Sequence, residues 1–493
     1  MTKGLMPFSF ANKFQLFASA EDEQRMQLHI TENTPLTAIA EVRRYYGVEL
    51  ELKLVDSEQF QLMLAAAYQQ NSQANMVLME QIGDEVNLFK LVEELPEDDD
   101  LLEGEDDAPI IKLINALITE AIKEGASDIH IEPYEKSLSV RLRVDGVMRE
   151  VISPNHKLAA LLISRIKVMA KLDIAEKRVP QDGRISVRIA GRALDIRVST
   201  LPSSHGERIV MRLLDKQGSR MGLPQLGMPE IISDRLQQAL LKPNGIILVT
   251  GPTGSGKTTT LYAGLGLLNE RSRNILTIED PIEYAVEGVG QTQVNSKTGM
   301  TFAKGLRAML RQDPDVMMVG EIRDFETAEI AVQASLTGHL VLSTLHTNNS
   351  LGAITRLNDI GVDSYLIATT LRAVLAQRLV RRLCQSCRTP YKLETDEALR
   401  LGIAGERYQG HRIFKASENG CDQCNHSGYK GRIGVYELLS VDAGMAELIH
   451  NQAAEAEIRA YLSERMTTMI EEARELVFQG MTSAEEVLRI IHE

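Results

Sequence analysis

The chain has 493 residues, of which 44% are hydrophobic, and it carries a net charge of −14, four cysteines and no tryptophan. Its length predicts three or four domains, and its acidity argues against an extended nucleic-acid surface, because phosphate binding normally needs an excess of basic residues. No window approaches the roughly 18 uninterrupted apolar residues of a membrane span, and four cysteines in so long a chain are not a disulfide framework, so we expect a soluble cytoplasmic protein.

Residues 1–92 are predicted to form a small α-rich or α/β docking domain. Apolar residues recur with helical spacing in PLTAIAEVRRYYGV and SEQFQLMLAAAYQQ, but no motif with recognisable chemistry accompanies them. The following stretch, 93–109, contains ten acidic residues and no basic residue. Because like charges repel one another, we expect this stretch to be an extended, flexible linker between domains.

A second N-terminal α/β domain is predicted over 110–215. It opens with an amphipathic helix that Gly125 is placed to end. Strands of period two follow, with turn signals at Asp145-Gly146 and at Ala190-Gly191. Residues 216–243 are expected to be a connector with its own helix. The apolar positions of the first helix, spaced by three and four, are Ile111, Ile114, Leu117, Ile118 and Ile122.

The stretch GPTGSGKTTTL follows the apolar run GIILVT and fits the phosphate-binding pattern G-x-x-x-x-G-K-[ST] completely. In such a loop the glycines let backbone N–H groups point at phosphates, Lys257 bridges the β- and γ-phosphates, and the Thr258 hydroxyl ligates Mg²⁺. We therefore predict an α/β P-loop core over 244–383 that binds ATP. The expected nucleotide-binding residues are Gly251, Pro252, Thr253, Gly254, Ser255, Gly256, Lys257, Thr258 and Thr259.

Hydrolysis needs a carboxylate near the γ-phosphate, and two predicted strands end in candidates. NILTIEDPIEY supplies Glu279 and Glu283, and DVMMVGEIRD supplies Glu321. The carboxyl ends of parallel strands meet at the edge where the P-loop lies, so these residues should converge there. The alternative for Glu283 and Glu321 is an ordinary loop carboxylate. Gly320 stands where many P-loop enzymes have Asp, which leaves Mg²⁺ to Thr258 and water, with Glu279 and Glu321 in the outer shell.

Two further pairs of residues are candidates. His339 and His346 bracket the apolar strand of LTGHLVLSTLHTN, where polar groups at a strand tip can sense the γ-phosphate; the alternative is a pair of structural histidines. Arg307 and Arg311 are one helical turn apart and could reach a neighbouring subunit's phosphates, or form a solvated basic face.

The cysteines form two C-x-x-C pairs separated by 33 residues. As thiolates they can close a small lobe, 384–424, around one structural tetrahedral Zn²⁺; a metal-free, reduced pair of turns is the alternative. The adjoining segment RAVLAQRLVRRLCQSCR is dense in arginine and fits either a contact with anionic lipid or an acidic partner, or a solvated helix. Residues 425–493 are expected to be the helical C-terminal part of the ATPase domain. The four candidate zinc ligands are Cys384, Cys387, Cys421 and Cys424.

In combination these motifs resemble those of the secretion ATPases of the type II and type IV pilus superfamily, and within it the type II secretion branch. The resemblance covers about residues 110–493 and includes GASDIHIEP and PQDGRI in the domain before the P-loop. It implies a RecA-like core preceded by a PAS-like α/β domain and a small N-terminal module, with a zinc-binding insertion.

The resemblance also implies a hexameric motor whose ATP hydrolysis drives pseudopilus assembly and protein export. Such a motor is cytoplasmic and attached to the inner membrane through a platform protein that binds the N-terminal domain. The resemblance assigns water activation to Glu321. It identifies Glu279 and Glu283 as the acidic box, and His339 and His346 as the histidine box. It also implies that Arg197 and Arg212, from LDIRVST and GERIVMR, reach the nucleotide.

Three other functions are weighed against this one. A type IV pilus assembly ATPase shares every motif, including the cysteines. A nucleotide-gated scaffold without turnover is disfavoured by the intact Lys257 and Glu321. A nucleic-acid translocase is disfavoured by the acidic charge and by the lack of an aromatic and basic stripe, so no nucleic-acid partner is expected.

Overall fold

The computed structural model describes residues 14, 16–22, 25–32, 34–46, 49–56, 108–189, 192–215, 221–402 and 412–492. The chain separates into two compact units, one of Met1–Pro96 with Arg188–Arg192 and one of Glu97–Val187 with Ala193–Glu493. None of the helices in these described ranges is long and apolar enough to cross a bilayer.

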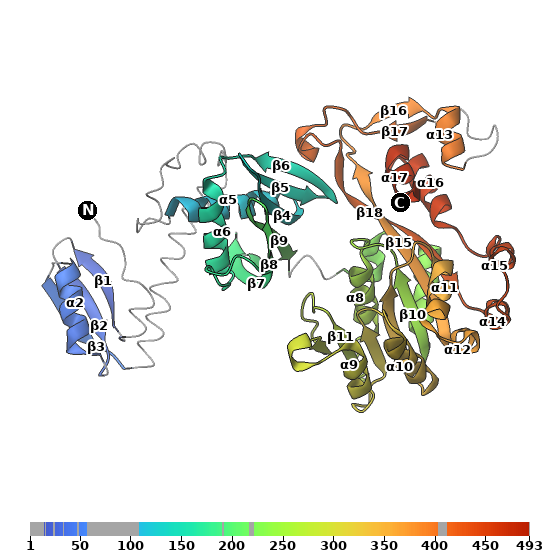
Figure 1. Cartoon of the computed structure of the whole chain (residues 1–493), viewed down its shortest axis with the longest axis horizontal. Coiled ribbons are helices and arrows are strands. Elements are labelled where there is room, and N and C mark those ends of the chain that lie inside the picture. The colour runs from blue at the N-terminus through green and yellow to red at the C-terminus, as the bar shows by residue number, and fades with distance from the viewer. Residues whose placement is uncertain are drawn as a thin grey trace. The chain divides into compact units, whose positions relative to one another are not determined.

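The N-terminal unit contains a three-stranded sheet and a helix (Figure 1). Strand β2 lies in the centre, antiparallel to β1 and parallel to β3. Leu28 of β2 and Ala38 and Val42 of α2 are buried, as expected of a helix packed on a sheet. The module is therefore α/β, whereas the second predicted helical segment, 57–70, lies outside the described residues. The elements are β1 (Leu16–Asp22), β2 (Arg25–Ile30), α2 (Leu36–Tyr46) and β3 (Glu49–Leu54).

The domain that precedes the P-loop contains a six-stranded sheet in the order β6-β5-β4-β9-β8-β7. Helix α5 ends near Gly125, whose φ is +67°, and contacts β4, while α6 contacts β9. The predicted turn at Asp145-Gly146 is confirmed, because both residues have positive φ between β5 and β6; the turn at 190–191 lies outside the described residues. The elements are α5 (Ala108–Lys123), β4 (Ala126–Pro133), β5 (Leu138–Val144), β6 (Val147–Ile152), α6 (Leu158–Met169), β7 (Gln181–Ile189), β8 (Arg192–Ser203) and β9 (Gly206–Asp215).

A seven-stranded sheet in the order β12-β11-β13-β14-β10-β15-β18 forms the centre of the P-loop core. All neighbouring strands are parallel except β18, which runs antiparallel to β15. Parallel order brings the carboxyl ends of β10, β11, β13 and β14 to one edge, as the motifs predict. The strands are β10 (Gly245–Thr250), β11 (Ile275–Glu279), β12 (Val289–Gln293), β13 (Val316–Val319), β14 (Leu340–Leu345), β15 (Leu371–Leu383) and β18 (Tyr429–Ser440).

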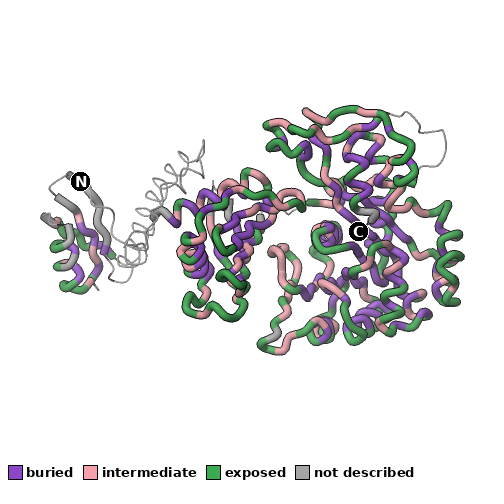
Figure 2. The backbone as a smooth tube through the Cα atoms, turned by 45° about the horizontal axis from the view of Figure 1, so that its top comes forward, coloured by how far each residue is buried: buried purple, intermediate pink, exposed green. Residues whose placement is uncertain are grey.

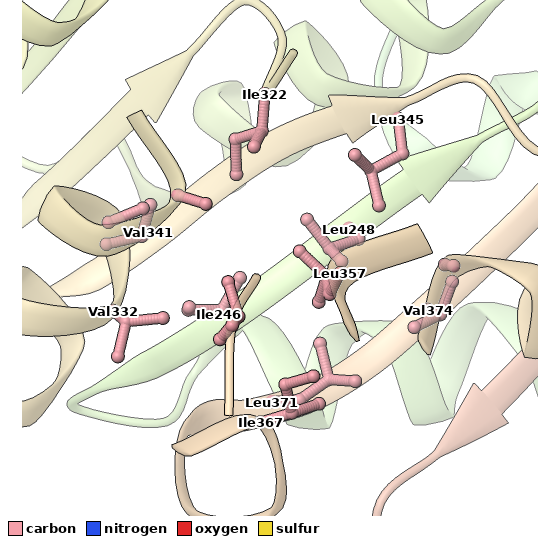
Figure 3. Packing of buried hydrophobic residues seen from close by; sticks show 14 of the residues in the cluster. Ile246, Leu248, Ile322, Val332, Val341, Leu345, Leu357, Ile367, Leu371 and Val374 are labelled. Carbon is pink, nitrogen blue, oxygen red and sulfur yellow. The ribbon is translucent and has the colours of Figure 1, made fainter. Parts of the chain in front are cut away.

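Helices cover both faces of this sheet and bury two apolar cores. On one face, Ile246 and Leu248 of β10 pack with residues of α9 to α12, α14 and α15. Figure 3 shows both residues together with Val332 of α10, Leu357 of α11 and Ile367 of α12. On the other face, Ile247 and Val249 pack with α7 and α8, so every residue of β10 is buried. Figure 2 shows that buried segments, in purple, run through the interior of the part of the molecule that contains the C-terminus. The helices are η2 (Leu223–Leu226), α7 (Glu230–Leu240), α8 (Lys257–Leu268), η3 (Ser296–Thr298), α9 (Phe302–Met309), α10 (Phe325–Leu336), α11 (Ser350–Ile360), α12 (Ser364–Thr370), α14 (Ala443–His450), α15 (Glu455–Leu462), α16 (Met469–Phe478) and α17 (Ala484–His492).

The cysteine-containing lobe has its own two-stranded sheet and a third apolar core. Ile413 and Leu393 of the lobe pack with Leu476 of α16 and Val487 of α17. The lobe is therefore anchored on the C-terminal helices as well as on the ends of β15 and β18. Its elements are β16 (Thr389–Lys392), α13 (Thr395–Arg400), β17 (Arg412–Lys415) and η5 (Asp422–Cys424).

The solvated helix considered for the arginine-rich segment is wrong, because most of the segment is strand β15 in the interior of the sheet. Arg378 is buried, Arg381 pairs with Glu486, and Arg388 lies over the ring of Phe414. Residues 425–493 also differ from the expected helical part, since they begin with β18. The secondary structure of both segments depends on pairing between strands that are distant in sequence. Helical periodicity within a short window gives no information about such pairing.

Candidate nucleotide-binding site

The loop between β10 and α8 has a backbone that only glycine adopts readily at three positions. Gly251, Gly254 and Gly256 have φ of +144°, +80° and +89°. A Cβ at Gly251 would lie 2.3 Å from the carbonyl oxygen of Gln377, so no larger residue fits. The loop runs into the N-terminus of α8, where free N–H groups and the helix dipole favour an anion.

Lys257 is held inside this loop. Its Nζ donates to the carbonyl oxygens of Gly251 and Pro252 at 2.8 and 2.9 Å, and the residue is 9% exposed. Burial lowers the pKa of Lys257, and the negative charge of Glu321 opposes that shift. A partly desolvated ammonium in a loop of this shape favours a phosphate as its partner.

The other predicted phosphate-binding residues follow the loop into the first turn of α8. Ser255 is buried and Gly256 and Thr259 are half-buried, whereas Pro252, Thr253, Gly254 and Thr258 are exposed. Thr258, an exposed residue, follows Lys257 in the motif position whose hydroxyl holds Mg²⁺ in P-loop proteins.

Glu321 follows β13 and retains one carboxylate oxygen without a hydrogen bond. Its Oε1 lies 2.5 Å from Nη2 of Arg323. Its Oε2 is buried and accepts no hydrogen bond from the described residues, although Nε2 of His346 lies 3.4 Å away. Burial lowers the pKa of His346 and the charge of Lys257 adds to this effect, while the charge of Glu321 opposes it; the net effect favours the neutral imidazole. Oε2 of Glu321 can therefore accept a hydrogen bond from a water molecule.

Glu279, at the end of β11, has both carboxylate oxygens occupied. Oε1 accepts hydrogen bonds from Thr277 Oγ1 at 2.6 Å and Gln291 Nε2 at 3.1 Å, and Oε2 accepts one from the hydroxyl of Tyr262. Burial, reinforced by Glu279, raises the pKa of Tyr262 far above its ordinary value. Since Tyr262 belongs to α8, Glu279 ties the P-loop helix to β11.

Glu283 contacts an arginine of the preceding domain. Nη1 of Arg197, on β8, lies 3.2 Å from Oε2 of Glu283, and Nη2 donates to the carbonyl of Ile282 at 2.7 Å. The Arg197 side chain is 20% exposed, so this pair is more shielded from solvent than a surface salt bridge.

Arg212, on β9, donates through Nε to Oδ1 of Asp128 at 2.9 Å and keeps more than half of its side chain exposed. Arg197 and Arg212 both line a cavity of about 480 Å³. The structure therefore brings both predicted arginines to one cavity together with the loop that follows β11. Other residues that line it include Asp182, Arg184, Asp280 and Pro281.

The structure does not bring His339 to the other site residues. His339 precedes β14, its carbonyl accepts a hydrogen bond from Gly245 at the start of β10, and its Nδ1 lies 2.8 Å from the carbonyl of Ala334. It is therefore at the opposite end of the strand from His346. Arg307 and Arg311 are exposed at the end of α9, where Arg307 pairs with Glu326 at 2.7 Å.

Several supporting residues carry no motif and were not predicted. Thr250 at the end of β10 accepts a hydrogen bond from the N–H of Thr347 at 2.9 Å, which fixes the loop that contains His346. Gln291 and Tyr262 hold Glu279, and Gln377 contacts the P-loop from β15. Their partners are 12 to 122 residues away in sequence, so only the order of strands could have indicated them.

The four cysteines converge, with all four sulfur atoms within 4.8 Å of one another. Three Sγ–Sγ distances are 3.7, 3.8 and 3.8 Å. Four sulfurs placed 2.3 Å from a common zinc in a tetrahedron are about 3.8 Å apart. The N–H groups of Cys421 and Gly428 point at the sulfur of Cys424 and, against the effect of burial, lower its pKa to about 6. The cluster fits a structural zinc ion.

Comparison with known proteins gives family matches that cover nearly the whole chain. The family model described as "Type II/IV secretion system protein" matches residues 103–489. A second model, which describes an N-terminal domain of "GSPII protein E", matches residues 5–68.

Individual relatives agree with these matches. The Type II secretion system ATPase E of Vibrio cholerae is 55% identical over 490 residues, which cover 99% of this chain and 97% of that protein. The Type II secretion system protein E of Pseudomonas aeruginosa is 56% identical over 488 residues, which cover 99% and 96%. Among solved structures, the pilus retraction motor PilT with bound ADP has a TM-score of 0.52 and 26% identity, covering 76% of this chain and 95% of its own.

Proposed function

The chain belongs to the type II/IV secretion system protein family, and from this membership we propose that it is an ATPase whose hydrolysis of ATP powers type II secretion. The observation that carries the proposal is the combination of a complete P-loop with the buried Oε2 of Glu321, which accepts no hydrogen bond within the described part of the chain. The names of relatives at about 55% identity over almost their whole length support the secretion role.

We assign the steps of hydrolysis to residues as follows. Backbone N–H groups of the loop and the ammonium of Lys257 bind the phosphates. Glu321 accepts a hydrogen bond from the attacking water through Oε2 and orients it, since a carboxylate within reach of that water is what the reaction needs. His346, in the loop after β14, would sense the γ-phosphate by hydrogen bonding. The positive charge of Arg197 and Arg212 would stabilise the negative charge that develops during transfer.

Mg²⁺ and zinc have separate places in this proposal. Mg²⁺, held by the Thr258 hydroxyl, would neutralise phosphate charge. Zinc, held by the four cysteines, would stabilise the lobe between β15 and β18. The carboxylate oxygens of Glu279 accept hydrogen bonds from Tyr262, Thr277 and Gln291. We assign Glu279 the role of holding α8, which contains Tyr262, in position.

We further propose that the chain works as a homo-hexamer at the cytoplasmic face of the inner membrane. Residues 1–92 would bind the platform protein and so attach the motor to the membrane. Arg307 and Arg311, exposed on the core, are available to a neighbouring subunit. Contact with anionic lipid is less well supported, because Arg378 of β15 is buried and Arg381 is paired with Glu486, and no nucleic-acid partner is proposed.

The test is Mg²⁺-dependent phosphate release by the purified full-length chain. Lys257→Ala should weaken nucleotide binding, and Glu321→Gln should retain binding and lose turnover, because an amide preserves shape but cannot accept a proton. Wild-type turnover in Glu321→Gln would assign the role to Glu279 or Glu283. Absence of turnover in the wild type under all conditions would favour the scaffold function, and stimulation by DNA or RNA would favour a translocase.

The identity of the membrane partner distinguishes a role in type II secretion from a role in pilus assembly. A pull-down with residues 1–92 as bait should capture the platform protein of a secretion system. Capture of a pilus platform protein would instead support a type IV pilus assembly ATPase.

A further inference from the structure

Gln377 lies beneath the P-loop and is almost completely buried, with 2% of its surface exposed. Its side-chain amide contacts both ends of the turn that leads into α8. Nε2 donates to the carbonyl oxygen of Ser255 at 2.6 Å, and Oε1 accepts a hydrogen bond from Thr260 Oγ1 at 2.8 Å. One side chain of β15 therefore holds the loop on one side of Lys257 and the helix on the other.

The same residue limits which side chains the loop can contain. The Gln377 carbonyl oxygen would lie 2.3 Å from a Cβ at Gly251, and its Nε2 would lie 3.1 Å from a Cβ at Gly256. The two outer glycines of the motif are thus packed directly on Gln377. Since β15 is paired with β10 on one side and β18 on the other, this support is itself fixed by the sheet.

We propose that Gln377 is a positioning residue that keeps the P-loop in the shape that receives phosphate. The inference rests on the proposed nucleotide-binding function. A loop of Gly, Ser and Thr has many accessible conformations, and only those with converging N–H groups bind phosphate well. The apparent dissociation constant rises in inverse proportion to the fraction of molecules in the competent shape.

The substitution Gln377→Met tests this proposal, because methionine has a similar length and fills the space without hydrogen bonds. It removes two hydrogen bonds, each of which contributes a factor of about two to ten to an equilibrium. We therefore expect the affinity for ADP, measured by titration calorimetry on the full chain with Mg²⁺, to fall by about four- to a hundredfold. Thr260→Val removes only the bond to Oε1 and should have a smaller effect, about two- to tenfold.

A matched control is Thr370→Val. Thr370 is 1% exposed, directly precedes β15, and donates through Oγ1 to the carbonyl of Leu366, away from the P-loop. Thr370→Val removes one local hydrogen bond, so it should lower the melting temperature by no more than Gln377→Met does, and it should leave ADP affinity unchanged. The double variant Gln377→Met with Thr260→Val should bind ADP no more weakly than Gln377→Met alone, because both changes remove the same contact.

The outcomes separate the inference from the function on which it rests. If the wild-type chain binds ADP and Gln377→Met binds it equally well, the positioning role is wrong and the proposed function stands. If both Gln377→Met and Thr370→Val lose affinity in proportion to their loss of stability, Gln377 has only a structural role. If the wild-type chain itself fails to bind ADP, the proposed nucleotide-binding function is wrong.

Discussion

Arg197 and Glu283 form an ion pair, with Nη1 of Arg197 3.2 Å from Oε2 of Glu283. The arginine belongs to the domain before the P-loop and the glutamate to the segment after β11. The same guanidinium also donates to the carbonyl of Ile282. The pair therefore links the arginine that we propose for catalysis to the segment that follows Glu279, whose side chain is tied to the P-loop helix.

Replacing Arg197 with alanine should reduce turnover far more than it reduces nucleotide affinity. A guanidinium that acts on the transition state contributes on the order of 10³- to 10⁵-fold in other phosphoryl-transfer enzymes. Phosphate release and ADP affinity should be measured together. Arg178→Ala is the matched control, because Arg178 is exposed in the same domain and, among the residues that the structure describes, pairs only with nearby Glu176. Unchanged turnover in Arg197→Ala would leave the arginine as a contact between segments.

The cysteine cluster should hold one zinc ion per chain. Metal analysis of protein purified without chelator should find one equivalent, and Cys421→Ser should lose it and lower the melting temperature, since a structural zinc contributes to folding directly. Ser386→Ala is the control. Ser386 lies within the first cysteine pair but donates to Gln423, and the variant should retain the metal. If the wild-type protein contains no zinc and melts at the same temperature as Cys421→Ser, the proposal is wrong.

The positions of Lys257, Glu321 and the cysteines could be predicted because short motifs specify their chemistry. A strand, a glycine-rich loop and a helix lie together in sequence, so the P-loop geometry follows from local rules. Two C-x-x-C pairs form a zinc site when their sulfur atoms converge, and the spacing of the cysteines indicates that they can.

Contacts that depend on which strands are neighbours could not be predicted. In the sequence, Gln377 is only one polar residue within an arginine-rich segment. Its proposed role depends on the pairing of β15 with β10. His339 and His346 flank one strand, and a strand of six residues separates its ends by about 20 Å. Because the carboxyl ends of parallel strands meet at the P-loop edge, the order in sequence favours His346, which follows β14, over His339, which precedes it. Predicting both residues at the site overlooked this rule.

Lys167 and Glu207 form a buried ion pair, with side chains 1% and 3% exposed, and Lys167 also donates to the carbonyl of Glu176. Lys167→Met should destabilise the chain by about 3–5 kcal/mol, because it leaves Glu207 buried without a partner. The double variant Lys167→Met with Glu207→Leu should recover much of this loss. Chemical unfolding followed by circular dichroism measures both, and equal stability of the single and double variants would contradict the argument.

Glu486 should make stability depend on acid pH. Its side chain is 1% exposed and is paired with Arg381 at 2.6 Å and with Arg489 at 3.2 Å. Burial alone would raise the pKa of Glu486, but the hydrogen bonds from Arg381 and Arg489 outweigh it, so the pKa lies below its ordinary value. A carboxylate with a lowered pKa in the folded state stabilises the protein above its unfolded pKa of about 4.3, and this contribution disappears as the pH falls through the folded value.

The variant Glu486→Gln tests this dependence. At pH 7 it should unfold more easily than the wild type, by up to about 3–5 kcal/mol, because Arg381 loses a buried partner. The difference should narrow as the pH falls below about 4.3, where protonation removes the same charge from the wild type. Glu455→Gln is the control, since Glu455 forms an exposed pair with Arg459 whose loss should cost less than about 1 kcal/mol. A stability difference between Glu486→Gln and wild type that stays constant from pH 7 to pH 3 would mean that the carboxylate charge makes no contribution and that packing alone explains the loss.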